Sequence, residues 1–317
     1  MPSGFLRFKA GLCGHNTSIK KDKGYRSLLD FRVGAIYNEN IKRGDEMKLS
    51  EIEAPAVAGV VREATEAAAK ARIKRCIENG ADMIDLHLSC IENADEATYA
   101  RIIAASTVPV LALNYNLKRD WSDAGFDEET RTASLLAAVR AGAAGADMQG
   151  YTFDVKSKSA FCGTDEYSFT KNKPLEVVTD PEVIEKQREF IAKVHDAGGE
   201  VLLSCHPNIG MSADAVVDLA AFLELRGADI IKIVTIADDE AAAMEAVRAM
   251  TRLKTEIKTP VSYHAAGKCG GITRVINPLL GGRIAFCVDA GDEFATAGQL
   301  DIAAMRKVTD GVRSLIK

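Results

Sequence analysis

From about Pro55 onward, short apolar runs alternate with longer segments in which apolar residues recur every three or four positions. Apolar runs of this length are typical of buried parallel strands, and the longer spacing is typical of helices that bury one face. The pattern predicts eight strands, at residues 56–61, 83–88, 108–113, 146–151, 200–204, 229–233, 261–263 and 284–288. It predicts eight helices, at residues 64–78, 94–105, 128–141, 181–197, 213–225, 239–256, 273–280 and 300–316.

Turn residues support this alternation. Helix-start signals occur in Thr179-Asp180-Pro181-Glu182 and in Ser212-Ala213-Asp214. The phrase Gly-Ala-Asp occurs at residues 80–82, 145–147 and 227–229, each time where a helix gives way to a strand. We interpret these three copies as recurring turns rather than as a binding motif.

Eight strands, each followed by a helix, predict an α/β fold of the closed parallel (β/α)8 (TIM) barrel type over residues 55–317. An open doubly wound sheet is the alternative, but the glycine-rich first turn of a dinucleotide-binding sheet is missing. Residues 1–54 are polar and irregular, and we predict an N-terminal extension or cap. Residues 152–179 form an unusually long connection after the fourth strand, consistent with either a lid or a dimer contact.

Composition narrows the class of protein. The net charge of −5 argues against nucleic acid as an obligate partner. No apolar stretch approaches a membrane span, and the first residues lack the apolar core of a signal peptide. The seven cysteines form no CxxC pair, which argues against a structural zinc site and a disulfide framework. We therefore expect a reduced, cytoplasmic protein.

Lys232 lies in the apolar run Gly227-Ala228-Asp229-Ile230-Ile231-Lys232-Ile233-Val234. A lysine is costly to bury, and burial favours its neutral form, which is a nucleophile toward ketones. Taken alone, the simpler interpretation is a strand-end lysine whose ammonium group reaches solvent. The residues that share its end of the barrel decide between these interpretations.

Barrel enzymes place their chemistry at the carboxyl ends of the strands. The second strand ends with Asp85 and His87, two positions apart and therefore on one face, either as a satisfied core pair or as site residues. The fifth strand delivers His206, and the turn after the seventh delivers Arg274 beside a helix amino terminus suited to an anion. An amine, a proton shuttle and an anion site suit chemistry next to the carbonyl of a small carboxylated keto compound.

Four segments, in chain order, carry a family resemblance. Leu203-Ser204-Cys205-His206 and Gly227-Ala228-Asp229-Ile230-Ile231-Lys232-Ile233 resemble the catalytic-histidine and Schiff-base-lysine strands of type I 3-dehydroquinate dehydratase. Gly271-Ile272-Thr273-Arg274 is similar to its Gly-x-Ile-Ser-Arg segment, and Ala295-Thr296-Ala297-Gly298-Gln299 resembles its closing loop after the eighth strand. The resemblance covers the chain from about residue 55 to its carboxyl terminus.

The resemblance implies a Schiff-base hydro-lyase of the shikimate pathway that needs no metal or organic cofactor. In that assignment Lys232 forms the imine and His206 is the general acid and base. Arg274 and Gln299 bind the substrate carboxylate, with Thr296 next to the position of the family's loop serine. A homodimer is expected only by this analogy.

The departures from the family fall at one side of the site. Asp85-x-His87 replaces the family's Glu-x-Arg, and Tyr115 stands in place of the arginine after the third strand. These residues are expected to orient ring hydroxyls, and the loss of a bidentate guanidinium is not conservative. The glutamate that orients the family's histidine has no clear counterpart, with Asp120 and Asp123 as candidates.

Three hypotheses follow from the residues and the resemblance. The first is dehydration of 3-dehydroquinate to 3-dehydroshikimate. The second, motivated by the changes at Asp85, His87 and Tyr115, is a related Schiff-base lyase or aldolase for another hydroxylated keto acid. The third is a non-catalytic binding protein on the same barrel, supported mainly by the missing histidine-orienting glutamate.

Overall fold

The chain divides into a unit of Met1–Gly44 and a compact unit of Asp45–Lys317. The computed structural model describes residues 48–114, 128–154, 176–207, 209–290, 292, 295 and 298–315. All of these residues belong to the second unit, and residues 1–47 of the predicted extension lie outside them.

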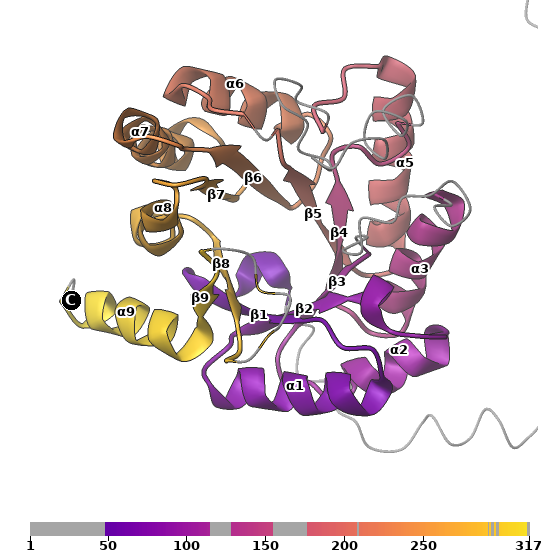
Figure 1. The fold of residues 1–317 in the computed structure, drawn as a ribbon. Helices are drawn as coiled ribbons and strands as arrows, with labels where there is room; N and C mark the ends of the chain where they lie inside the picture. The colour runs from indigo at the N-terminus through magenta and orange to yellow at the C-terminus, as the bar shows by residue number, and fades with distance from the viewer. Residues whose placement is uncertain are drawn as a thin grey trace, which may run out of the picture. The chain divides into compact units, whose positions relative to one another are not determined.

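The strands of this unit form one parallel sheet that curls into a barrel (Figure 1). Their order in the sheet is β7-β6-β5-β4-β3-β2-β1-β8-β9. The curled sheet closes between β7 and β8, where the Arg283 N–H donates to the Val261 carbonyl at 3.1 Å and Ser262 Oγ donates to the Ile284 carbonyl at 2.7 Å. The strands are β1 (Ala56–Val61), β2 (Met83–His87), β3 (Val110–Leu113), β4 (Gly145–Gln149), β5 (Glu200–Cys205), β6 (Ile230–Ile236), β7 (Val261–Ala266), β8 (Ile284–Val288) and β9 (Leu300–Asp301).

Helices surround the sheet on its outer side (Figure 1). They are α1 (Glu66–Glu78), α2 (Glu96–Ile103), α3 (Glu128–Arg140), α5 (Pro181–Asp196), α6 (Ala213–Glu224), α7 (Glu240–Glu256), α8 (Gly271–Ile276) and α9 (Ile302–Leu315), with short 3-10 turns at Leu49–Glu51, Leu88–Cys90 and Pro278–Leu280. The predicted start signals cap their helices, since Asp180 Oδ1 accepts from the Glu182 N–H at 3.0 Å and Ser212 Oγ accepts from the Ala215 N–H at 3.3 Å. Within the described part of the chain, no helix has the length and apolar character to cross a membrane.

Alternate strand residues divide the apolar side chains between two cores, as the period of two requires. The larger core lies between the sheet and the helices. The smaller core fills the barrel interior and contains Ala56, Ala58, Val60, Met83, Leu111, Leu202, Ile230, Ile284, Phe286 and Val288. The (β/α)8 prediction is therefore confirmed, and residues continuing the inner columns must point into the barrel mouth.

The amino-terminal end of the barrel is closed by a short segment before β1. Leu49 is 1% exposed and packs with Ile52 in the interior core. The Ser50 N–H donates to Glu200 Oε2 at 2.9 Å, and the Arg283 guanidinium donates to the Ser50 carbonyl. This part of the predicted extension thus contributes to the barrel core.

Candidate active site

Lys232 points into the barrel from β6. The strand continues to Ile236, so the lysine is its third residue and not, as predicted, close to its end. The residue is half-buried, and its ammonium group lies 4.2 Å from the ring centroid of Phe286, an inward-facing residue of β8. A cation over an aromatic face is electrostatically favourable, and this contact keeps the amine inside the barrel.

Two buried carboxylates also face the barrel interior. Burial raises the pKa of Asp147 on β4, and the positive charge of Lys232 opposes this effect. Burial also raises the pKa of Asp85 on β2, but His87, Lys232 and Arg62 outweigh it, so the Asp85 pKa lies below its usual value. Lys232 therefore interacts electrostatically with both carboxylates, and of the two Asp85 is the one whose charged form is favoured.

His206 follows β5 and is paired with a buried glutamate. Glu176 is completely buried, and its Oε2 accepts from the His206 N–H at 2.7 Å and contacts His206 Nδ1 at 2.8 Å. A carboxylate at Nδ1 favours the tautomer with hydrogen on Nδ1, which leaves a lone pair on Nε2. Nε2 is then the atom of His206 able to take a proton.

Glu176 is a site residue that the sequence analysis missed. It lies in the long connection after β4, while the proposed candidates Asp120 and Asp123 lie outside the described residues. No local pattern marks Glu176, because its position depends on where the connection returns to β5. The end of a long connection beside a predicted catalytic histidine was the available signal.

The backbone of Glu176 is held by contacts that need small or precisely placed neighbours. A Cβ on Gly150 would lie 2.2 Å from the Glu176 carbonyl oxygen, so only glycine permits this approach. Cys205 Sγ lies 3.5 Å from the same oxygen. The Gly150 N–H donates to the Ser204 carbonyl at 2.7 Å, which ties the end of β4 to β5.

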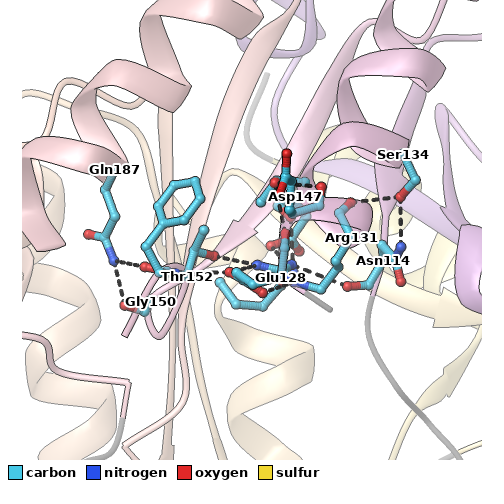
Figure 2. A network of polar contacts seen from close by, with 12 residues as sticks. Asn114, Glu128, Arg131, Ser134, Asp147, Gly150, Thr152 and Gln187 are labelled. Atoms are coloured by element: carbon cyan, nitrogen blue, oxygen red, sulfur yellow. Dashed lines mark hydrogen bonds and ion pairs between the residues drawn. The ribbon is translucent and has the colours of Figure 1, made fainter. Parts of the chain in front are cut away.

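Arg131 organises the polar residues at the ends of β3 and β4 (Figure 2). Its buried guanidinium donates to Gln149 Oε1 at 2.5 Å, to Thr152 Oγ1 at 2.8 Å and to both carboxylate oxygens of Glu128 at 2.7 Å. Glu128 Oε1 also accepts from the Phe153 N–H at 2.9 Å. The first residues of the long connection are thereby fixed to α3.

The other end of the connection is fixed by a residue of α5 and by Arg226, which follows α6. Gln187 is completely buried and donates to the carbonyls of Gly150 at 2.8 Å and Thr152 at 2.9 Å (Figure 2). Arg226 donates from Nε to Gln187 Oε1 at 2.8 Å and from Nη2 to the Val178 carbonyl at 2.7 Å. Both stems of residues 152–179 are held by one buried network, and Glu176 lies within the second stem.

Asp85 and His87 face the interior together, as predicted. Both are more than nine-tenths buried, and His87 Nε2 lies 3.5 Å from Asp85 Oδ2. Within the described residues, Asp85 Oδ1 and His87 Nδ1 have no hydrogen-bond partner. Buried polar atoms left unpaired are costly, so these two atoms are suited to bind polar groups of a ligand.

The anion side of the mouth contains Arg274 and Gln299. Arg274 is a half-buried residue of α8, and burial lowers its pKa. A Cβ on Gly298 would lie 3.9 Å from Arg274 Nε, so the loop after β8 passes beside the guanidinium. Gln299 Oε1 accepts from Arg62 Nη2 at 3.3 Å, and Arg62 Nη1 forms an ion pair of 2.8 Å with Asp292.

Arg62, which continues the inner column of β1, is a second residue that the sequence analysis missed. The predicted site residues Tyr115 and Thr296 lie outside the described residues. The other predicted residues, Lys232, His206, Asp85, His87, Arg274 and Gln299, all lie at the carboxyl-terminal mouth of one barrel.

Comparison with known proteins supports the resemblance found in the sequence. A family model described as type I 3-dehydroquinase matches residues 172–314. The 3-dehydroquinate dehydratase of Desulfotalea psychrophila is 26% identical over 233 residues, which cover 72% of this chain and 86% of that protein.

Solved structures share the fold. The 3-dehydroquinate dehydratase of Geobacillus kaustophilus aligns with a TM-score of 0.66 at 15% identity, covering 85% of this chain and 97% of that one. The type I enzyme of Clostridium difficile, with covalently modified comenic acid, aligns with a TM-score of 0.66 at 13% identity, covering 84% and 98%. At these identities the two structures support the barrel architecture.

Proposed function

Because this chain is a divergent relative of the type I 3-dehydroquinases, we propose that it is a hydro-lyase that dehydrates 3-dehydroquinate to 3-dehydroshikimate through an imine on Lys232. The observation that carries the proposal is the pairing of strands β5 and β6, in which Ser204 lies opposite Lys232. His206, with its Glu176 partner, lies on the neighbouring strand two residues beyond Ser204, and this register supports a role for it next to the amine. The reaction would serve the shikimate pathway or quinate catabolism.

Each step has a group at hand. The Lys232 amine adds to the ring ketone and expels water, which gives an iminium that acidifies the adjacent carbon. His206 Nε2 removes a proton from that carbon and forms an enamine. The imidazolium then returns the proton to the departing hydroxyl group, the C–O bond breaks, and hydrolysis of the product imine restores the amine. The sequence of steps requires no metal or organic cofactor.

The polar and charged residues at the barrel mouth suggest how the substrate binds. Arg274 and Gln299 are proposed to bind the carboxylate, because a guanidinium and an amide suit an anion. Asp85 and His87 are proposed to bind ring hydroxyls through Asp85 Oδ1 and His87 Nδ1, the atoms without a partner in the described residues. Tyr115 and Thr296 complete the proposed set on the basis of the family resemblance.

Borohydride reduction in the presence of 3-dehydroquinate tests this function. We expect mass spectrometry of the reduced protein to locate one adduct on Lys232, and we expect K232A to lose turnover by roughly 10⁴-fold or more. The matched control is K268A, since Lys268 is an exposed lysine in the loop after β7. No adduct, or an adduct on Lys268, contradicts the proposal.

A related Schiff-base lyase or aldolase is the second candidate. Asp85 and His87 are shorter than the Glu and Arg of the family, which favours a changed substituent at that side of the ring. A panel of hydroxylated keto acids separates the two, since turnover of 3-dehydroquinate at ordinary enzyme rates rejects the alternative. The structure weakens the hypothesis of a non-catalytic binding protein. That hypothesis depended on a missing histidine-orienting glutamate, and Glu176 contacts His206 in that way.

A further inference from the structure

His264 is a third imidazole at the barrel mouth, and the proposed mechanism leaves it without a role. It lies on β7, where the strand register pairs it with Val234 and pairs Ser262 with Lys232. On the other side of β6, Cys205 pairs with Ile233, so His206 comes level with Val234. The two histidines therefore lie on either side of β6, both level with Val234, which is the next inward-facing residue after Lys232. Their strands are about 10 Å apart.

The imidazole of His264 points inward and makes no hydrogen bond to the described residues. It is 6% exposed. Its neighbour Tyr263 faces the opposite side of the sheet and is satisfied, since its hydroxyl lies 2.8 Å from Thr235 Oγ1. His264 thus keeps hydrogen-bonding groups on the side of β7 that faces the barrel interior, where a ligand can reach them.

Three basic residues affect the protonation of this ring. Burial, and then the positive charges of Arg274, Lys232 and His206, hold the His264 pKa well below its usual value. The ring is thus a neutral imidazole at neutral pH, with one N–H donor and one acceptor nitrogen. A neutral donor close to Arg274 and Lys232 can bind a substrate oxygen that lies between the carboxylate at Arg274 and the ketone at Lys232.

In the proposed substrate, the hydroxyl that departs is attached to the carbon that bears the carboxylate, and one methylene separates that carbon from the ketone. With the carboxylate at Arg274 and the ketone at Lys232, the departing oxygen lies between these two anchors. We propose that His264 donates a hydrogen bond to this leaving hydroxyl oxygen, while His206, on the other side of β6, removes and returns the proton. The inference rests on the proposed function and assigns His264 to C–O bond cleavage.

The test compares H264L, which removes the donor, with H264Q, which keeps an N–H group. For H264L we expect kcat with 3-dehydroquinate to fall about 100-fold, as for loss of one preorganised donor, and H264Q to retain more activity. Borohydride trapping on Lys232 should persist in both variants. Unreacted substrate should gain more solvent deuterium with H264L than with the unmodified enzyme, because the proton is still removed while C–O cleavage is slow.

Thermal unfolding checks that each variant is folded, and H264M replaces H264L if the branched side chain does not pack. Near-normal kcat and KM in H264L overturn the inference alone. Equal loss of trapping, exchange and turnover also overturns it, because that result indicates a structural role. Absence of any adduct in the unmodified protein overturns the proposed function, and the inference with it.

Discussion

At the scale of single residues, the contact between Glu176 and His206 sets the protonation pattern of the site. One carboxylate oxygen accepts from both the backbone N–H and Nδ1 of His206, at 2.7 and 2.8 Å. This double contact fixes both the ring's orientation and its tautomer. Glu176 acts through His206 and is therefore a positioning residue.

We predict that E176Q lowers kcat by about 100-fold or more, because an amide can present an N–H to Nδ1 and favour the wrong tautomer. Imine trapping on Lys232 should survive, whereas exchange of the adjacent substrate hydrogen with deuterated solvent should slow in parallel with kcat. E185Q is the control, since Glu185 is an exposed residue of α5. Normal exchange in E176Q would show that Glu176 does not position the base.

At the scale of elements, the connection after β4 is joined to catalysis through its stems. Gln187 holds Gly150 and Thr152 on one stem, and Arg226 links Gln187 to Val178 on the other. Burial lowers the pKa of Arg226 to about 10. The position of Glu176 therefore depends on α5, on the turn after α6 and on the end of β4.

The variant G150A, which adds one carbon at the end of β4, tests whether the position of Glu176 controls catalysis. The new Cβ would lie 2.2 Å from the Glu176 carbonyl oxygen, so the stem must move and His206 loses its fixed partner. We expect kcat to fall at least 10-fold and stability to fall by about 1–3 kcal/mol, with imine trapping retained. G311A is the matched control, because a Cβ at Gly311 in α9 meets nothing within 4 Å. Equal activity of G150A and the unmodified protein would refute the coupling.

At the scale of the whole molecule, the pattern of apolar runs predicted the barrel well. Strands 56–61 and 284–288 match β1 and β8 because polar or turn residues bound each run. β6 extends to Ile236 rather than stopping at residue 233, since Thr235 is buried and hydrogen-bonded to Tyr263 and so continues the strand despite its polarity. The sequence pattern is therefore a poor guide to the end of a strand where a polar residue is buried and forms a hydrogen bond to a neighbouring strand.

Site residues on the strands could be predicted from the sequence, whereas a site residue in a long connection could not. Lys232, His206, Asp85 and His87 lie on the strands or directly after them, and their inward positions follow from the period of two along each strand. Glu176 reaches the site only because Gly150 allows its backbone to approach the end of β4. His264 directly follows the predicted strand 261–263, but its burial and its register opposite Val234 became known only from the structure.

Ion pairs join the end of β8 to the first helix. Asp289, directly after β8, is 4% exposed and forms ion pairs of 2.9 Å with Arg72 and Arg75 of α1. Its other oxygen accepts from Asn79 Nδ2 at 2.8 Å. Burial raises the pKa of Asp289, but the two guanidinium groups outweigh it, so the Asp289 pKa lies below its usual value.

Because the folded-state pKa is depressed, the charged form of Asp289 stabilises the protein above the unfolded pKa of about 4, and this contribution is lost as the pH falls through the folded value. We expect D289N to lower the unfolding free energy by about 2 kcal/mol near pH 7, less than for a fully buried pair because Arg75 is half-exposed. Urea unfolding at about pH 7 and about pH 3 should find a smaller difference from the unmodified protein at the lower pH. A difference that stayed constant between these pH values would mean that the carboxylate charge does not hold β8 to α1.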